Sequence, residues 1–313
     1  VLGYVVEQQV HTIANDISFD LYNGELTCMM GPNGVGKSTL LKAIMNQNPP
    51  LKGDIWLDKK EIRLMNEQDR AKNIAVVLTE KIRSGLMTVR ELVALGRGWL
   101  GHLSKADNKI VNQVLEMTHL EVIAQKKLSE LSDGQRQTAM IGRALAQDSS
   151  IMILDEPTAH LDLTNRFEIM YLLKKLAKEA GKAILVVTHD LEVAMETADQ
   201  LWIMINQEPL VSGSPEDLML EGHIQKLLPG NKWEIDASNG KIRLKNPGVL
   251  PEITGPEHLI YWVRNSLRKN IEMPMPEKIV ATENPFEITI YCNQNHYTFS
   301  RTSEMVRFLK KGK

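Results

Sequence analysis

The chain has 313 residues, of which 43% are hydrophobic and 24% are charged, and its formal net charge is −2. This length suits one large domain or two, and the near-neutral charge argues against binding to nucleic acid through bulk charge. No apolar run approaches the roughly 18 residues needed to cross a bilayer, and the N-terminus lacks a basic region followed by an apolar core, so we expect a cytoplasmic chain without a secretory signal.

The first predicted elements are two short strands. Residues 17–21 and 26–30 are mostly apolar, and the intervening residues 22–25 signal a turn. The second strand runs into a glycine-rich loop and then into a helical segment at residues 38–45. A strand, a glycine-rich loop and a helix in this order form the unit that binds phosphates in many nucleotide-binding proteins.

The loop itself has the spacing of a phosphate-binding loop, with a glycine, four further residues and then Gly36, Lys37 and Ser38. Glycines let backbone N–H groups turn toward a phosphate, and the positive end of the following helix adds to the attraction. Lys37 offers its charge to the phosphate oxygens, and the Ser38 hydroxyl is suited to bind Mg²⁺. A turn that only joins a strand to a helix is the alternative. The residues expected to hold ATP are Gly31, Pro32, Asn33, Gly34, Val35, Gly36, Lys37, Ser38 and Thr39.

The middle of the chain predicts one strand at residues 74–78 and then mostly helix over residues 88–150. Thr88 and Ser104 each precede an acidic residue by three positions, which is typical of a capped helix start. Apolar residues at helical spacing over positions 110–117 predict a helix with one buried face.

Two fully apolar runs, residues 151–154 and 184–187, follow and are separated by a helical segment at residues 165–180. Strand, helix and strand in this order predict a parallel α/β core, in which ligands bind beyond the carboxyl ends of the strands. The first run ends in Asp155 and Glu156, and the second leads to His189. We therefore expect these polar side chains to meet at one edge of the sheet.

The adjacent carboxylates suit the hydrolysis of a nucleotide. Asp155 is expected to hold Mg²⁺, directly or through water, and Glu156 to orient the attacking water or accept its proton. The alternative for two acids that precede Pro157 is a charged helix N-terminus.

Beyond residue 228 the pattern changes, because Pro229-Gly230 interrupts the chain and two predicted hairpins with two helices follow. Residues 229–313 carry 13 basic and 9 acidic side chains, so their formal charge is +4. We expect one large α/β domain at residues 1–228 and a separate small α+β domain at residues 229–313, whose role the sequence leaves open. Cys28 and Cys292 fit no disulfide framework or zinc spacing, and are expected to be free thiols.

Five motifs in this order resemble those of the ATP-binding cassette of ABC transporters, over about residues 1–225. The resemblance implies a P-loop NTPase fold of the α/β class, with a mixed sheet as its core and a helical subdomain at about residues 82–150. The matching parts are the phosphate loop (31–38), the signature segment (131–135), the Mg²⁺ strand (151–156), the loop after it (159–162) and the switch histidine, His189.

The resemblance also implies a homodimer whose two copies pack head to tail and sandwich two ATP molecules. Each phosphate loop would face Ser132, Gly134 and Gln135 of the other copy, at the start of a helix whose positive end attracts the γ-phosphate.

Further roles follow from the matched motifs. His189 would contact the γ-phosphate and act in hydrolysis with Glu156 and Lys37. Tyr4 matches the aromatic residue that stacks on adenine, and Asp162 belongs to the nucleotide-binding set.

Two positions depart from the family pattern. Asp133 stands where the family usually has glycine, and its carboxylate either lies close to the phosphates or points outward. Glu80 stands where the family has a glutamine that contacts Mg²⁺ and senses the membrane partner. A carboxylate is a good Mg²⁺ ligand, so we expect Ser38, Glu80 and Asp155 to bind the metal.

Residues 88–97 and 159–162 are similar to one subgroup, the importers of iron–siderophore complexes, haem and cobalamin. This implies an ATPase subunit that works at the cytoplasmic face of a membrane as a peripheral protein, beneath a separate permease and indirectly with a substrate-binding protein. The alternatives are an exporter subunit, an ABC ATPase of DNA repair or translation, and an inactive nucleotide-binding regulator.

Overall fold

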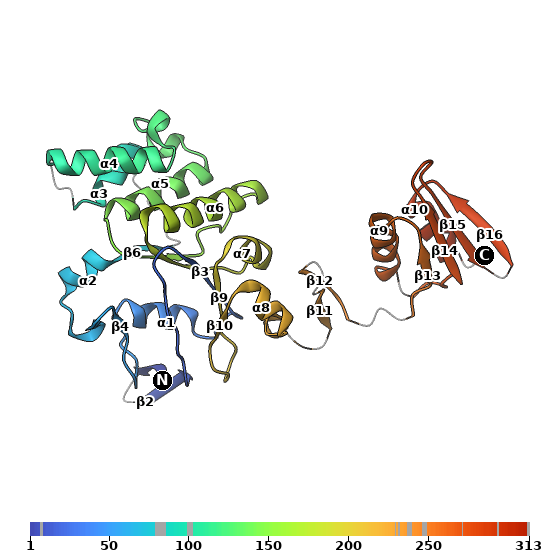
Figure 1. Ribbon diagram of the computed structural model, residues 1–313, viewed down its shortest axis with the longest axis horizontal. Coiled ribbons are helices and arrows are strands. Elements are labelled where there is room, and N and C mark those ends of the chain that lie inside the picture. Colours follow the sequence, from blue (N-terminus) through green and yellow to red (C-terminus); the bar gives the residue numbers. More distant parts are fainter. Residues whose placement is uncertain are drawn as a thin grey trace. The chain divides into compact units, whose positions relative to one another are not determined.

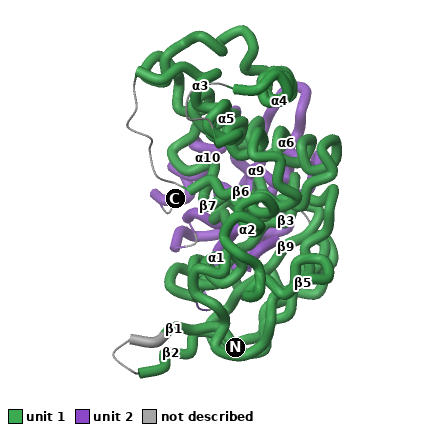
Figure 2. Tube along the Cα trace, turned by 90° about the vertical axis from the view of Figure 1, so that its left-hand side faces the viewer, with its two compact units in different colours: residues 1–228, 237–241 green, residues 229–236, 242–313 purple. Residues whose placement is uncertain are grey.

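A six-stranded sheet organises the first part of the chain. The computed structural model describes residues 1–6, 9–78, 86–98, 103–228, 230, 232–236, 240–245, 249–270, 272–292 and 294–311. Clustering of contacts divides the chain into two units, residues 1–228 with 237–241 and residues 229–236 with 242–313 (Figure 2). Each unit is described by itself below.

The strand order of the sheet is β10-β9-β3-β8-β7-β6. Every neighbouring pair is parallel except β9 and β10, which makes the sheet mixed as expected. The central strands β3, β7 and β8 are almost entirely buried, which matches their apolar sequences. The strands are β3 (Leu26–Met30), β6 (Ile74–Val77), β7 (Ile151–Asp155), β8 (Ala183–Val187), β9 (Gln200–Ile203) and β10 (Val211–Gly213).

Helices lie on both faces of this sheet (Figure 1). One face and α1 share a single hydrophobic core, whereas α6 and α7 pack against strands of the sheet on the other side. Helices α3, α4 and α5 form a group that the chain visits between β6 and β7. The α-helices of this unit are α1 (Lys37–Ile44), α2 (Glu67–Asn73), α3 (Val89–Leu95), α4 (Lys105–Met117), α5 (Asp133–Ala146), α6 (Leu163–Ala180), α7 (Leu191–Thr197) and α8 (Pro215–Leu220).

Short elements complete the unit. They are the hairpins β1 (Leu2–Val6) with β2 (Gln9–Ala14) and β4 (Trp56–Leu57) with β5 (Lys60–Glu61), and the 3₁₀ turns η1 (Ile62–Leu64), η2 (Glu121–Ile123), η3 (Leu128–Glu130) and η4 (Ile224–Leu227).

The helix starts predicted at Thr88 and Ser104 are confirmed. Each side chain accepts a hydrogen bond from the backbone N–H of the acidic residue three positions on, and the carboxylate of that residue accepts one from the backbone N–H of the cap residue. Side-chain caps of this kind satisfy N–H groups that the helix itself leaves unpaired.

The strand predicted at residues 17–21 is wrong, because the structure has no regular element there. Ile17, Phe19 and Leu21 still pack against the main core, and the Phe19 ring lies 4.8 Å from that of Trp202. Alternating apolar residues report that one face of a segment is buried, but they do not show that a neighbouring strand is there to pair with it.

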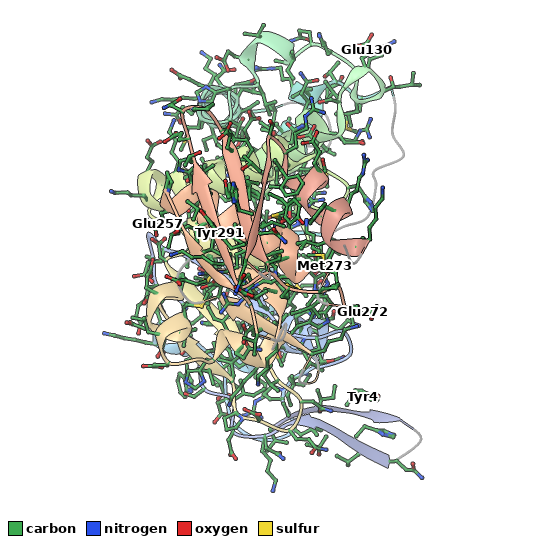
Figure 3. The ribbon with its side chains drawn as sticks, turned by 90° about the vertical axis from the view of Figure 1, so that its right-hand side faces the viewer. Tyr4, Glu130, Glu257, Glu272, Met273 and Tyr291 are labelled. Atoms are coloured by element: carbon green, nitrogen blue, oxygen red, sulfur yellow. The ribbon has the colours of Figure 1, made fainter. Side chains whose placement is uncertain are left out.

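The second unit is a four-stranded sheet with two helices on one face. Its strand order is β13-β14-β15-β16, with β13 and β14 parallel and the other pairs antiparallel. Buried side chains from the sheet and both helices form a core of their own. Figure 3 looks onto the face that the helices leave open, where Tyr291 lies.

Both predicted hairpins and both predicted helices are present, whereas the strands β13 and β14 were not predicted. The elements of this unit are β11 (Trp233–Asp236), β12 (Lys241–Leu244), β13 (Glu252–Thr254), α9 (Glu257–Arg268), β14 (Lys278–Thr282), β15 (Glu287–Cys292), β16 (Asn295–Phe299) and α10 (Thr302–Lys310). Over the described residues of the whole chain, no helix has the length and apolar character needed to cross a membrane.

Two matched core substitutions test whether the two cores unfold separately. Ile290 and Leu185 are both fully buried, one in each core. We expect Ile290→Ala and Leu185→Ala each to destabilise their own unit by about 2–5 kcal/mol, because each leaves a cavity. Differential scanning calorimetry should show two transitions, each lowered by only one of the variants. A single transition that both variants lower equally would contradict the separation of the two cores.

Candidate active site

One pocket of about 480 Å³ gathers most of the predicted site residues. It lies at the carboxyl edge of the sheet, where β3, β7 and β8 end side by side. The phosphate loop, the acidic pair Asp155 and Glu156, and His189 lie far apart in the sequence. The order of the parallel strands brings them together. The lining residues are Tyr4, Ile13, Asn33, Gly34, Gly36, Lys37, Ser38, Thr39, Asp155, Glu156, Val187 and His189.

The loop between β3 and α1 requires glycine at two of its positions. A Cβ atom at Gly31 would come within 2.4 Å of the Met204 carbonyl oxygen. Gly36 has a φ of +109°, and a Cβ atom there would lie 2.3 Å from the Ile13 side chain. The chain can therefore turn tightly here and leave its backbone N–H groups accessible at the start of α1.

Lys37 is the first residue of α1, and its side chain is largely buried under the loop. Its ammonium group donates to the carbonyl oxygens of Gly31 at 2.7 Å and Pro32 at 3.0 Å. Burial lowers the pKa of Lys37, while Glu156 and Asp155 oppose that shift. A lysine ammonium has three donors, so these two bonds hold the charge at the loop and leave a donor for a ligand.

The carboxylates of Asp155 and Glu156 lie at the end of β7. Burial raises the pKa of Asp155, and the positive charge of Lys37 partly offsets this. Burial is also the main cause of the raised pKa of Glu156, which the charge of His189 opposes and that of Asp155 reinforces. Carboxylates whose pKa is raised by burial in a cleft are typical of catalytic acids and bases.

Glu156 and His189 form a direct contact across the strand ends. The Nε2 atom of His189 lies 2.8 Å from Oε1 of Glu156. Glu156 also has a φ of +50°, which is uncommon for a residue with a side chain, and its N–H donates to the Val187 carbonyl oxygen. The neighbouring strand β8 thus holds Glu156 in a strained backbone conformation, a feature that clusters at functional sites.

Tyr4 lines the pocket from the hairpin of β1 and β2 (Figure 3). It pairs across the hairpin with His11, and the two rings are stacked with their centroids 5.2 Å apart. Tyr4 thus brings an aromatic ring to the pocket, and its stacking on adenine stays a prediction.

The signature residues lie elsewhere. Ser132, Gly134 and Gln135 line a separate cleft between α5 and α6. Ser132 caps α5, because its hydroxyl accepts from the Gln135 N–H at 3.2 Å while the Gln135 side chain accepts from the Ser132 N–H. Within one chain, the structure does not bring these residues to the phosphate loop.

Asp133 is the first residue of α5, and its side chain is 59% exposed. An oxygen of its carboxylate lies 2.9 Å from Nη1 of Arg136, one turn further along the helix. This ion pair offsets the negative charge that the sequence introduced where the family has glycine, so the electrostatic cost at a nearby phosphate is reduced.

Asp162 acts as the N-cap of α6. Its carboxylate accepts from the backbone N–H of Asn165 at 2.9 Å and from the Asn165 side-chain amide at 2.7 Å. A Cβ atom added to Gly134 would lie only 2.8 Å from the Oδ1 atom of Asn165. Glycine at position 134 therefore lets the first turn of α6 approach the signature helix closely.

Arg166 is a residue that the sequence reasoning missed. Its Nε donates to the carbonyl oxygen of Leu161 at 2.9 Å, and its Nη1 lies 3.1 Å from the Asp190 carboxylate. Asp190 directly follows His189 and caps α7. Arg166 thus ties the segment after β7 to the residue next to His189. Its only sequence signal was its position four residues after Asp162 in a predicted helix.

The structure describes two of the three residues that we predicted to bind Mg²⁺. Ser38 and Asp155 line the same pocket and offer the hydroxyl and carboxylate oxygens that suit a hard cation such as Mg²⁺. Glu80 lies outside the described residues. Among the residues that are described, no group of three or more His, Cys, Asp or Glu side chains is arranged to hold a metal. The protein's own donors thus fit an ion that takes its remaining ligands from phosphate oxygens and water.

The first unit is similar in sequence to known ATP-binding proteins of ABC transporters. A family model described as "ABC transporter" matches residues 14–159. The chain is 38% identical to an uncharacterised ABC transporter ATP-binding protein of Methanocaldococcus jannaschii, over 82% of this chain and 92% of that protein. It is 32% identical to the ferric enterobactin transport ATP-binding protein of Escherichia coli, over 69% and 82% of the two chains. It is 41% identical to the iron(3+)-hydroxamate import ATP-binding protein of Bacillus subtilis, over 58% and 69%.

Solved structures give the same result for the fold. The structure of cbiO1 from Clostridium perfringens, part of the ABC transporter complex cbiONQ, superposes with a TM-score of 0.64 at 29% identity, over 71% of this chain and 90% of that one. A bacterial ABC transporter cassette solved as a dimer superposes with a TM-score of 0.56 at 30% identity, over 68% of this chain and 95% of that one.

Removing the Arg166 contacts tests whether they position the site. We expect Arg166→Met to lower kcat for ATP hydrolysis about tenfold with little change in nucleotide affinity, because the nucleotide pocket itself is untouched. Arg166→Lys should recover only part of the loss, since lysine cannot donate to both partners in the same geometry. Lys178→Met, at an exposed position of the same helix, is the control. Steady-state kinetics would measure kcat, and melting temperatures would check that each variant is folded. Equal kcat values for Arg166→Met and Lys178→Met would contradict a positioning role for Arg166.

Proposed function

The chain belongs to the ABC transporter family as an ATP-binding subunit with ATPase activity, and on that premise we propose that it energises the uptake of an iron complex (a siderophore or haem) or cobalamin through a separate membrane permease. The observation that carries the chemical part is the single pocket in which Lys37, Asp155, Glu156 and His189 meet.

Phosphate binding belongs to the loop and to Lys37. Backbone N–H groups of the loop and the positive end of α1 surround the β-phosphate, while the Lys37 ammonium contacts the β- and γ-phosphate oxygens. Tyr4 stacks on the adenine. Mg²⁺, held by Ser38, Asp155 and Glu80, would neutralise charge on the β- and γ-phosphates.

Hydrolysis belongs to Glu156 and His189. The carboxylate of Glu156 orients the attacking water and accepts its proton, and the raised pKa from burial makes it a better base than an ordinary glutamate. His189, 2.8 Å from Glu156, contacts the γ-phosphate from the other side of the water. Because hydrolysis needs ionised Glu156, activity should fall as the pH drops through a pKa above the usual glutamate value.

The working unit that we propose is a head-to-tail dimer of this chain. Ser132, Gly134 and Gln135 lie at the N-terminus of α5, away from the chain's own phosphate loop. In a second copy these groups would complete the site, with the Ser132 hydroxyl and the Gly134 N–H reaching the γ-phosphate. Asp162 would approach the nucleotide at the same interface. A related cassette has been solved as a dimer, which supports this arrangement.

The cargo class rests on the relatives. They include the ATP-binding proteins of ferric enterobactin transport in Escherichia coli and of iron(3+)-hydroxamate import in Bacillus subtilis. We propose that this chain likewise works as a peripheral subunit at the cytoplasmic face of the membrane, beneath a separate permease. A substrate-binding protein would deliver the cargo to that permease. Residues 1–228 would form the cassette, with its helical subdomain at about residues 82–150, and residues 229–313 an accessory domain.

The assignment of Glu156 as the base predicts a trapped complex. Glu156→Gln keeps the shape of the side chain but cannot accept a proton, so we expect ATP binding to persist while turnover falls at least about a hundredfold. Size-exclusion chromatography with ATP should then show an accumulated dimer. Glu179→Gln, at an exposed position on α6, is the control. Hydrolysis by Glu156→Gln at the parent rate would rule out this role.

The phosphate-binding role of Lys37 predicts a loss of affinity. Lys37→Ala removes a charge-assisted contact with the phosphates, and we expect the dissociation constant for a fluorescent ATP analogue to rise about tenfold or more. Lys42→Ala, on the exposed side of the same helix, should bind like the parent chain. Equal affinities for the two variants would contradict the phosphate-loop assignment.

A further inference from the structure

A groove of about 600 Å³ lies between α9 and α10 in the second unit. The helices face the sheet with apolar side chains such as Val263, Leu267, Met305 and Leu309, which are buried in the core of that unit. The groove is formed by other side chains of the two helices and of the residues that follow α9. They are Trp262, Asn265, Ser266, Lys269, Asn270, Thr302, Ser303, Val306, Arg307 and Lys310.

Positive charge dominates the groove. Lys269, Arg307 and Lys310 line it, and no acidic residue does. In the described part of the chain, none of these three cations forms an ion pair or a hydrogen bond through its side chain. Arg243 of the same unit shows the contrast, because it pairs with Glu234 and Asp236 at 2.6 Å each. Three neighbouring cations without carboxylate partners form a site that attracts an anion.

Trp262 adds an aromatic surface to this site. Its side chain is 58% exposed although it lies on a helix whose opposite face is buried. Tyr261 packs edge-on against it, with ring centroids 5.1 Å apart and an interplanar angle of 85°. An exposed tryptophan beside cations is a surface on which a planar ring stacks.

Short polar side chains supply the remaining contacts. Asn265, Thr302 and Ser303 form no side-chain hydrogen bond within the part of the chain that the structure describes, so their donors and acceptors are available. Ser266 and Asn270 are fixed by bonds to backbone carbonyls of α9, at 2.8 Å and 2.9 Å. A few convergent polar groups around an apolar surface are typical of a small-molecule site, and such sites commonly enclose about 300–1,000 Å³.

From this combination we propose that the groove between α9 and α10 binds a nucleoside monophosphate or a closely similar phosphorylated planar ligand. The ring stacks on Trp262, the phosphate lies among Lys269, Arg307 and Lys310, and the amide and hydroxyl groups contact the sugar or ring edge. A membrane surface fits less well, because most apolar side chains of both helices pack in the core and the groove itself contains only Trp262 and Val306 as apolar lining residues.

AMP is a suitable probe, because the phosphate loop of the cassette is built around β- and γ-phosphates that AMP lacks. Isothermal titration of the full chain should show one AMP per chain, and the Lys37→Ala chain should bind AMP equally well. Adenosine and inorganic phosphate, which each supply half of the ligand, should bind at least about tenfold more weakly than AMP.

Matched variants locate the site. Arg307→Gln with Lys310→Gln should raise the AMP dissociation constant about tenfold or more, and Trp262→Leu should do so about tenfold. Lys245→Gln and Trp233→Leu remove the same residue types from the unit outside the groove, and should bind AMP like the parent chain.

Three results would overturn the proposal. They are no heat with AMP at millimolar concentration, unchanged affinity in both groove variants, and sedimentation of the chain with anionic phospholipid vesicles in a manner that Trp262→Leu abolishes. Circular dichroism of each variant checks that a lost signal is not a lost fold, and the substituted side chains lie on the surface rather than in the core. None of these outcomes depends on whether the cassette serves an importer.

Discussion

The order of strands in the parallel sheet is the constraint on which the site depends. Strands β3, β8 and β7 are neighbours although long segments of chain separate them. Because they are parallel, their carboxyl ends emerge at one edge, and each delivers one part of the chemistry there. Lys37 follows β3, His189 follows β8, and Glu156 follows β7. An order that placed other strands between these three would separate the phosphate loop from Glu156 and His189.

The same edge holds several charges in a partly buried space. Burial lowers the pKa of Lys37 and raises those of Asp155 and Glu156, so each group is less stable in its charged form than it would be in water. Their mutual attraction only partly compensates. Such a cluster is suited to a polyanionic ligand with a metal ion, which adds charges of both signs to the site.

A second constraint concerns the signature residues, which the fold keeps apart from the chain's own phosphate loop. The first turn of α6 links the two regions. Asn165 lies against Gly134 on α5, and Arg166 contacts both Leu161 and Asp190, the neighbour of His189. A change near His189 therefore has a direct path of packed and hydrogen-bonded groups to the signature helix. In the proposed dimer each copy would serve two nucleotides, and this continuity would connect the two sites.

The sequence by itself determined the phosphate loop, the buried strands, the capped helices and the acidic pair at the end of β7, because spacing and apolar pattern depend on local geometry. Tyr4 entered only through the family resemblance, and Ile13 and Val187 of the same pocket were not predicted. The strand predicted at residues 17–21 was wrong, because the alternation of apolar residues there reflects burial of one face without a partner strand. Only the tertiary structure decided that Glu156 contacts His189, that Arg136 neutralises Asp133, that Arg166 joins two loops, and that Trp262 shares a groove with unpaired cations. These contacts join residues through side-chain rotamers or the packing of separate elements, and neither is encoded in periodicity along the chain.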